Sequence, residues 1–127
     1  MTRLNLLIAD DDPDDARLVA YKVKRAGFAV EWRRVDDEAA FSRELPTADL
    51  VICDFSMPKF SPARALEVIR QLGLTTPLLL VSGSVSATAV EQIMTLGAVG
   101  YLAKDQLAGL GQAVRDALDG RSSGPAA

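Results

Sequence analysis

The stretch LVICDFSMPKF, residues 50–60, decides the fold. Its first four residues, Leu50–Cys53, are all apolar without any polar alternation, which predicts a short strand buried on both faces of a sheet. Asp54 follows at once, and Pro58 forces the chain into an irregular turn four positions later. A buried strand that leads directly into a carboxylate indicates that something at the end of this strand requires a negative charge.

The N-terminus repeats this arrangement. An apolar run over residues 4–9 leads into three aspartates, Asp10, Asp11 and Asp12. Asp12 stands directly before Pro13, and this pair predicts an N-cap followed by the first residue of a helix. Asp10 and Asp11 therefore come directly after a predicted strand, as Asp54 does.

Strand and helix patterns alternate five times along the chain. Buried strands are predicted at residues 4–9, 50–53 and 78–81, and weaker strand patterns lie at residues 30–35 and 100–103. Five helical patterns lie between and after these strands. The first runs from Asp12 to Gly27, and the second covers residues 37–45. The third starts near Pro62 and carries Leu66, Ile69 and Leu72, the fourth holds Val90, Ile93 and Met94 and stops at Gly97, and the last has Leu107, Leu110, Val114 and Leu118. The alternation predicts an α/β protein, a doubly wound parallel sheet with helices on both faces. We assign residues 1–120 to one domain and expect residues 121–127, RSSGPAA, to be a disordered tail or linker.

Polar residues follow four of the five predicted strands. Asp10 and Asp11 follow the first, Asp54 the third, Ser82 the fourth and Lys104 the fifth. In a parallel sheet these positions all fall on one edge, beyond the carboxyl ends of the strands, where such folds bind their ligands. This convergence is far more specific than any of the residues alone.

The composition excludes several classes of protein. The chain has 127 residues, enough for one domain, and its net charge of −3 without a basic stripe argues against nucleic-acid binding. No apolar run approaches the ~20 residues that span a bilayer. The single cysteine, Cys53, rules out a disulfide framework and favours a cytoplasmic location, and we expect it to be a buried, inert thiol.

The chain contains no histidine, which removes Ser-His-Asp and Cys-His catalysis and most zinc sites. Three carboxylates at one edge repel one another, and at neutral pH they need a proton, a cation or both. Because the ligands are oxygen atoms, we expect a hard divalent ion, with magnesium the first choice. Lys104 adds a positive charge and Ser82 a hydroxyl donor, so the set describes an acceptor of a phosphoryl group.

Each of these residues also has a plainer interpretation. Asp12 is expected to be only a helix cap, and Asp14 and Asp15 only surface charges favoured by the helix dipole. Asp10 or Asp11 alone could equally be a cap. Taken singly, Asp54 could start a turn, Ser82 could cap the fourth helix, and Lys104 could be a solvated charge.

A calcium loop is excluded, although DDDPD begins like one. Asp15 stands where that loop needs glycine, and Tyr21 stands where it needs a bidentate glutamate. Trp32 and Phe55 are expected to pack in the core rather than to contact a ligand. Only the joint placement of the polar residues beyond the strands favours a site.

The motifs resemble those of the receiver domain of bacterial two-component response regulators, over Leu4 to about Leu118. They are the acidic pair at residues 10–11, D-x-x-M-P at residues 54–58, the hydroxyl of Ser82 in LLLVSGS, and GYLAK at residues 100–104. The chain looks most like receivers joined to sensor, histidine-kinase or diguanylate-cyclase modules, and so like the front of a longer protein. The resemblance implies a flavodoxin-like (βα)5 fold with strand order 2-1-3-4-5.

The resemblance also implies a role for each site residue. Asp54 would accept a phosphoryl group from the histidine of a kinase or of a histidine phosphotransfer protein. Mg2+, or Mn2+ in its place, would be held by oxygen ligands from Asp10, mainly through a water, Asp11, Asp54 and the backbone carbonyl of Ser56. The phosphoryl-binding and switch residues would be Ser82, which swings to the phosphoryl group, Gly83, Lys104 and Tyr101, which turns inward behind the serine.

Three positions depart from the usual pattern of the family. Asp105 follows Lys104 where many receivers have proline, so we expect a different loop after the fifth strand. Pro62 replaces the usual glycine-containing turn. Gly83 follows the switch serine and leaves the pocket more open.

The implied function is that of a cytoplasmic signalling module that promotes only its own phosphorylation and dephosphorylation. Its partners would be a histidine kinase, a fused C-terminal output module, and a second copy bound through the surface of the fourth helix, fifth strand and fifth helix. Neither nucleic acid nor membrane binding is expected. Two alternatives stay open: a receiver-like interaction module that works without phosphorylation, and, more remotely, an aspartyl-phosphate phosphatase, which would need a second aspartate where Ser56 stands.

Overall fold

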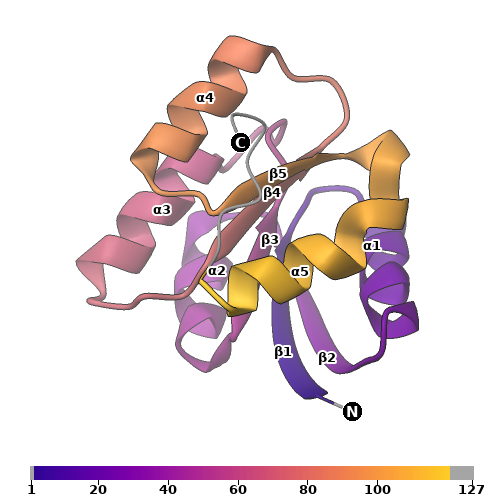
Figure 1. Cartoon of the computed structure of the whole chain (residues 1–127). Coiled ribbons are helices and arrows are strands. Elements are labelled where there is room, and N and C mark those ends of the chain that lie inside the picture. Colours follow the sequence, from indigo (N-terminus) through magenta and orange to yellow (C-terminus); the bar gives the residue numbers. More distant parts are fainter. Residues whose placement is uncertain (1, 121–127) are drawn as a thin grey trace.

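Five parallel strands form one sheet at the centre of the protein (Figure 1). The computed structural model describes residues 2–120, and the tail expected at residues 121–127 lies outside the described residues. The strands are β1 (Thr2–Ala9), β2 (Phe28–Val35), β3 (Leu50–Cys53), β4 (Leu78–Ser82) and β5 (Gly100–Ala103). Their order is β2-β1-β3-β4-β5 with every pair parallel, which confirms the flavodoxin-like fold and the strand order predicted from the sequence.

The sequence of each strand explains its place in the sheet. β3 and β4 are buried at every position, as expected for apolar strands that are covered on both faces. β2 lies at an edge and carries Glu31, Arg33 and Arg34, whose charges discourage pairing with another chain and also weaken its sequence pattern. Both β1 and β2 begin two residues earlier than the sequence predicts, at Thr2 and Phe28.

Helices cover both faces of the sheet. They are α1 (Pro13–Arg25), α2 (Glu38–Glu44), α3 (Pro62–Gln71), α4 (Ala87–Leu96) and α5 (Leu110–Leu118), with short 3-10 helices η1 (Leu45–Thr47) and η2 (Lys104–Gly109). α1 and α5 pack on one face, and α2, α3 and α4 pack on the other (Figure 1). Within residues 2–120 no helix is both long and apolar enough to cross a membrane.

Alternate side chains of the inner strands point into two separate cores. In β1, Leu6 and Ile8 face the core under α1 and α5, whereas Leu7 and Ala9 face the core under α2, α3 and α4. β3 and β4 alternate in the same way. Because each strand is held from both sides, the residues at its carboxyl end are placed by a rigid, close-packed frame.

The helix caps follow the sequence closely. Asp12 caps α1 and accepts hydrogen bonds from the N–H groups of Asp14 and Asp15, with Pro13 as the first helical residue, which confirms the predicted cap. Ser61 caps α3 in the same way, and Pro62 begins that helix. The proline therefore serves as a helix start at this departure from the family pattern.

The last helix begins later than predicted. The sequence predicts a single helix along Leu107 to Leu118, but η2 precedes α5, and a kink with non-helical angles lies at Gln106 (φ −124, ψ 34). Leu107 and Leu110 are nevertheless both buried, because their spacing of three residues suits a 3-10 turn as well as an α-helix.

Two leucines of the predicted helical patterns are exposed. Leu72 is 49% exposed because α3 ends at Gln71 and Leu72 is its C-cap, and Leu118 is 36% exposed at the end of α5. Both lie where a helix ends, so the apolar stripe stops one turn earlier than its periodicity indicates.

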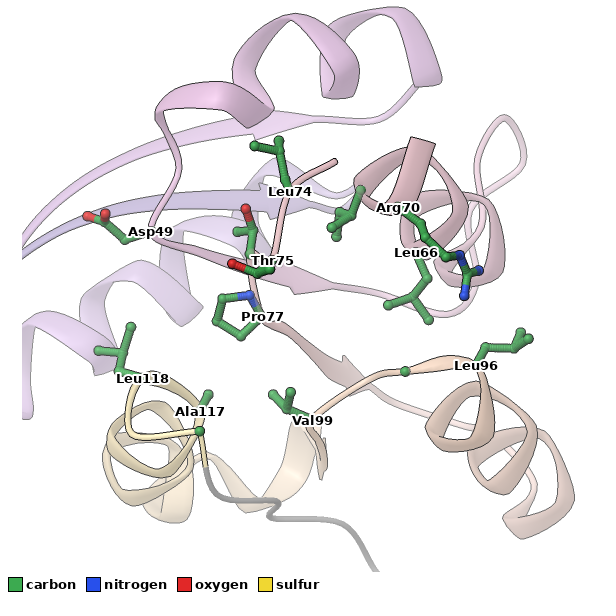
Figure 2. A pocket seen from close by; sticks show the side chains of 14 residues that line it. Asp49, Leu66, Arg70, Leu74, Thr75, Pro77, Leu96, Val99, Ala117 and Leu118 are labelled. Carbon is green, nitrogen blue, oxygen red and sulfur yellow. The ribbon is translucent and has the colours of Figure 1, made fainter. Parts of the chain in front are cut away.

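A groove of about 440 Å³ lies at the amino ends of the strands. Pro77 and Val99, which directly precede β4 and β5, line it together with Leu66 of α3, Leu96 of α4 and Leu118 of α5 (Figure 2). The polar residues singled out in the sequence follow the opposite, carboxyl ends of the strands. The groove is therefore separate from the candidate site.

Candidate functional site

Three polar residues are buried in the described part of the chain, and all three lie at or just beyond the carboxyl end of a strand. Asp10 follows β1, Asp54 follows β3, and Ser82 is the last residue of β4. Their exposed fractions are 2%, 6% and 1%. Burial of polar groups is costly without partners, so their convergence at one place marks this edge of the sheet as the candidate site.

The backbone fixes the two buried aspartates. The N–H of Asp10 donates to the carbonyl of Val35 at 3.0 Å, and the N–H of Asp54 donates to the carbonyl of Ala9 at 2.8 Å. These bonds continue the hydrogen-bonding pattern of the sheet by one residue beyond the strands. The carboxylates are thus placed by the register of β1 against β2 and β3 rather than by flexible loops.

Three carboxylates form one cluster. Asp10, Asp11 and Asp54 each offer an oxygen, and these atoms lie within 4.8 Å of one another. Asp11 is exposed, so the cluster opens to solvent on that side. Oxygen ligands of this kind, with room left for waters, match the preference of Mg2+.

The charge on Asp10 is energetically unfavourable. Burial raises the pKa of its carboxyl above the ordinary value, and the nearby charge of Asp54 acts in the same direction. A hydrogen bond from the N–H of Asp12 to Oδ1, at 2.9 Å, and the ammonium of Lys104 oppose this rise. A divalent cation in the cluster would relieve the remaining cost.

Donors converge on the carboxylate of Asp54. The hydroxyl of Ser82 and the N–H of Phe55 both donate to its Oδ1, at 2.8 Å and 2.9 Å. Its Oδ2 lies 3.6 Å from Nζ of Lys104. A carboxylate surrounded by a hydroxyl, an N–H group and an ammonium has the partners that a phosphoryl group at this position would need.

Lys104 is held by two carboxylates. Its Nζ lies 3.0 Å from Oδ2 of Asp10 and 2.9 Å from Oδ2 of Asp15. Burial alone would lower the pKa of Lys104, but the hydrogen bonds to Asp15 and Asp10 outweigh it and hold the pKa above its ordinary value. The interpretation of Asp15 as a mere surface charge is therefore wrong.

The remaining predicted site residues lie nearby with different exposure. Ser56 is exposed in the loop after β3, and Gly83 is exposed directly after β4 with open space where a Cβ would be. Tyr101 lies in β5, half-buried, and packs against the core under α2, α3 and α4. Ser56 and Gly83 thus lie beyond the carboxyl ends of β3 and β4, whereas Tyr101 lies within β5, two residues before its end.

Two contacts at the site were missed by the sequence analysis. One is the ion pair of Asp15, and the other is Arg34, whose Nη1 donates to the backbone carbonyl of Asp10 at 3.2 Å. Arg34 lies in β2 beside Ile8 of β1. The strand order 2-1-3-4-5 implied by the resemblance places β2 beside β1, so the contact between Arg34 and Asp10 could have been predicted from it.

Three residues set aside as structural behave as expected. Cys53 is a buried free thiol, and burial, helped by the charges of Asp54 and Asp10, raises its pKa, so the reactive thiolate is disfavoured. Trp32 and Phe55 pack against the two cores. These findings confirm that the three side chains pack, while the backbone N–H of Phe55 donates to Asp54.

Fold and site together define a receiver-type module, with an acidic cluster, a hydroxyl and a lysine at the carboxyl edge of a 2-1-3-4-5 sheet. The family model of the response regulator receiver domain matches residues 6–115. The chain therefore belongs to the response regulator receiver domain family, as its motifs predicted. Receiver domains are generally non-enzymatic signal transducers.

The relatives are regulators and sensor kinases. The chain is 25% identical over 101 residues to the cell cycle transcriptional regulator CtrA of Caulobacter vibrioides, covering 80% of this chain and 44% of that protein. It is 28% identical over 99 residues to the sensor histidine kinase RcsC of Escherichia coli, covering 78% of this chain and 10% of that protein. The chain thus spans less than half the length of these relatives.

Solved structures have the same fold. The signal receiver domain of the putative response regulator NarL from Mycobacterium tuberculosis matches with a TM-score of 0.82 at 27% identity, covering 95% of this chain and all of that one. A putative response regulator from Chloroflexus aurantiacus matches with a TM-score of 0.79 at 28% identity, covering 93% of this chain and 99% of that one.

Proposed function

We propose that this protein is a phosphoacceptor module of two-component signal transduction, with Asp54 as the acceptor. The observation that carries the proposal is the convergence of Ser82, Phe55 and Lys104 on one buried carboxylate, beside two further carboxylates. The same donors are placed to hold the oxygens of a phosphoryl group once it is attached.

The transfer requires one bond to form and one to break. A carboxylate oxygen of Asp54 attacks the phosphorus of a phosphohistidine, the P–N bond breaks, and the donor's nitrogen leaves with the electron pair. The product is an acyl phosphate. Lys104 offers its ammonium to the phosphoryl oxygens, and Ser82 offers its hydroxyl, so the chain's own residues orient and neutralise the transferred group.

We infer that a divalent cation belongs to this site. The donor set fits Mg2+, or Mn2+ in its place: Asp10, mainly through a water, Asp11, Asp54 and the backbone carbonyl of Ser56 would hold it. The unfavourable charge of Asp10 supports this assignment, because a cation would offset it. When bound, the cation supplies charge neutralisation of the transferred phosphoryl group.

We propose the partners from the relatives and the site. A histidine kinase or histidine phosphotransfer protein would supply the phosphoryl group, because the chain itself has no histidine. A C-terminal output module and a homodimer through α4, β5 and α5 are further proposals, as are a cytoplasmic location and the absence of nucleic-acid and membrane binding. The module would not be an enzyme, because it would promote only its own phosphorylation and dephosphorylation.

The two other functions have weaker support. A phosphatase of the aspartyl-phosphate type would need a second carboxylate two positions after Asp54, and Ser56 stands there. An interaction module without phosphorylation would not need Asp10, Asp11, Ser82 and Lys104 all in place around that carboxylate.

Acetyl phosphate tests the proposal. With Mg2+, the wild-type protein should gain one phosphoryl group in intact mass, and the modification should be stable to acid and labile to alkali. Asp54→Ala should gain none, and excess EDTA should abolish labelling of the wild type. Unchanged mass of the wild type, or labelling that survives in Asp54→Ala, would contradict the assignment.

A further inference from the structure

Asp15 reaches the site from a different element than the other carboxylates. It lies in the first turn of α1, which packs against η2, the segment that begins with Lys104 (Figure 1). Its Oδ2 is 2.9 Å from Nζ of Lys104, and its side chain is 42% exposed while that of Lys104 is 20% exposed. The contact therefore joins a half-exposed aspartate to a lysine whose side chain is mostly buried.

We propose that Asp15 is a positioning residue that holds the ammonium of Lys104 beside Asp54 for the incoming phosphoryl group. The inference rests on the proposed phosphoacceptor function and adds a residue to it. Lysine has a long, flexible side chain, so an anchor on its ammonium reduces the entropy lost when the phosphoryl group binds.

The hydrogen-bond donors of Lys104 are compatible with this role. An ammonium has three N–H groups. Asp15 and Asp10 lie at hydrogen-bond distance, and Oδ2 of Asp54 lies at 3.6 Å, beyond it. One N–H thus remains for an oxygen of a phosphoryl group on Asp54, and Lys104 can accept that partner without leaving Asp15.

Asp10 cannot supply the same anchor alone. Its carboxylate belongs to the acidic cluster with Asp11 and Asp54, and a cation held there would draw on the same charge. Asp15 is not part of that cluster. Asp15 can therefore keep its ion pair with Lys104 while a cation is bound by the other carboxylates.

An opposing effect must be separated from positioning. Each aspartate of the first turn also adds negative charge that repels an anionic group at Asp54. Replacing such an aspartate with a neutral residue would therefore strengthen anion binding. Asp14 is the matched control, because it lies in the same turn with the same charge, is 85% exposed and pairs with Arg17. Comparing Asp15→Ala with Asp14→Ala controls for the loss of one negative charge and for helix-dipole effects.

Beryllofluoride, a mimic of the phosphoryl group, tests the proposal. Its affinity for the Mg2+-loaded protein is measured by 19F NMR titration in the wild type, Asp14→Ala, Asp15→Ala and Asp15→Glu. We expect Asp15→Ala to bind about fivefold more weakly than Asp14→Ala, the upper range for a partly exposed ion pair. Asp15→Glu should recover part of the loss, because it restores a carboxylate.

A second readout reports on Lys104 directly. In metal-free protein without beryllofluoride, the Nζ protons of Lys104 should exchange with water faster in Asp15→Ala than in Asp14→Ala, as followed by NMR. Equal or tighter beryllofluoride binding in Asp15→Ala than in Asp14→Ala would overturn the inference alone. Failure of the wild-type protein to bind beryllofluoride would overturn the proposed function, and the inference with it.

Discussion

At the scale of single residues, the site holds two buried carboxylates, Asp10 and Asp54, that have hydrogen-bond partners. In the part of the chain that the structure describes, no buried side-chain nitrogen or oxygen lacks a hydrogen-bond partner. Asp10 nevertheless has a raised pKa, since its partners do not fully compensate its burial. The metal-free protein therefore carries a local cost at Asp10 that binding of a cation would reduce.

The first residue-scale prediction concerns Asp10→Asn in the metal-free protein. Between the ordinary carboxyl pKa of 3.8 and its higher value in the folded protein, the folded state binds more protons than the unfolded chain. The contribution of Asp10 to stability therefore falls as the pH rises through this window. Asparagine cannot ionise, so the variant should be more stable at neutral pH, by on the order of 1 kcal/mol.

Urea unfolding in EDTA at a series of pH values measures this effect. The stability difference between Asp10→Asn and the wild type should grow as the pH rises above about 4 and level off once Asp10 is ionised in the folded state. With excess Mg2+ the sign should reverse, because the variant has lost a ligand. If the stability difference between Asp10→Asn and the wild type does not change with pH, ionisation of Asp10 does not destabilise the folded protein.

The predicted site residues that the structure brings together have one property in common. Asp10, Asp54 and Lys104 directly follow strands, and Ser82 is the last residue of one. The rule that parallel sheets collect their functional groups at the carboxyl ends therefore places them together. Asp15 was missed because its position in a first helical turn already has a sufficient explanation, the helix dipole. Which face of that turn meets η2 depends on packing between distant segments.

At the scale of elements, α1 and α5 approach closely beside β1. A Cβ on Gly111 of α5 would lie 2.6 Å from Cβ of Ala26, the C-cap of α1. No pair of side-chain carbons tolerates that distance, and neither atom is at the end of a flexible side chain. Gly111 therefore sets the spacing of the two helices that cover one face of the sheet.

Gly111→Ala should destabilise the protein. Alanine improves helix propensity by ~1 kcal/mol, but the clash forces the helices apart, and overpacking of this kind costs ~1–3 kcal/mol. We expect a net loss of up to about 2 kcal/mol in the free energy of unfolding, measured by urea denaturation. Gly109→Ala is the control, because its Cβ would meet Leu102 at an ordinary 3.6 Å. Equal stability of the two variants would argue against a close contact between α1 and α5.

The type of helix that follows β5 could not be predicted from the sequence. Leu107 and Leu110 are three residues apart, a spacing common to α and 3-10 helices, so the sequence pattern could not distinguish the two. Asp105, where proline is usual in the family, lies in η2 directly after Lys104. A kink with non-helical angles lies at Gln106 in this loop.

At the scale of the whole molecule, the sheet connects the site with the face made by α4 and β5. Tyr101 is paired in register with Leu80, and Ser82 with Ala103. Side chains two positions apart on a strand point to the same face, so Ser82 and Tyr101 both face the side of the sheet that carries α4. A movement of the serine hydroxyl can therefore change the packing around the tyrosine ring.

The final prediction follows from this arrangement. A phosphoryl group on Asp54 should attract the hydroxyl of Ser82 through a charge-assisted hydrogen bond, because the hydroxyl already lies 2.8 Å from the carboxylate. As Ser82 moves toward the new group, Tyr101 should fill the space behind it. Amide exchange should then change at residues 81–86 and 100–105 when beryllofluoride is added with Mg2+, as measured by mass spectrometry.

Ser82→Ala separates ligand binding from the response of the tyrosine. The variant keeps the acidic cluster and Lys104, so beryllofluoride should still bind, but the change at residues 100–105 should be much smaller than in the wild type. Phosphorylation can shift the population of states only by its differential interaction with them, and in this site Ser82 supplies that difference. If the wild type binds beryllofluoride and residues 100–105 exchange as before, this coupling is absent, and the signal must leave the domain through another surface.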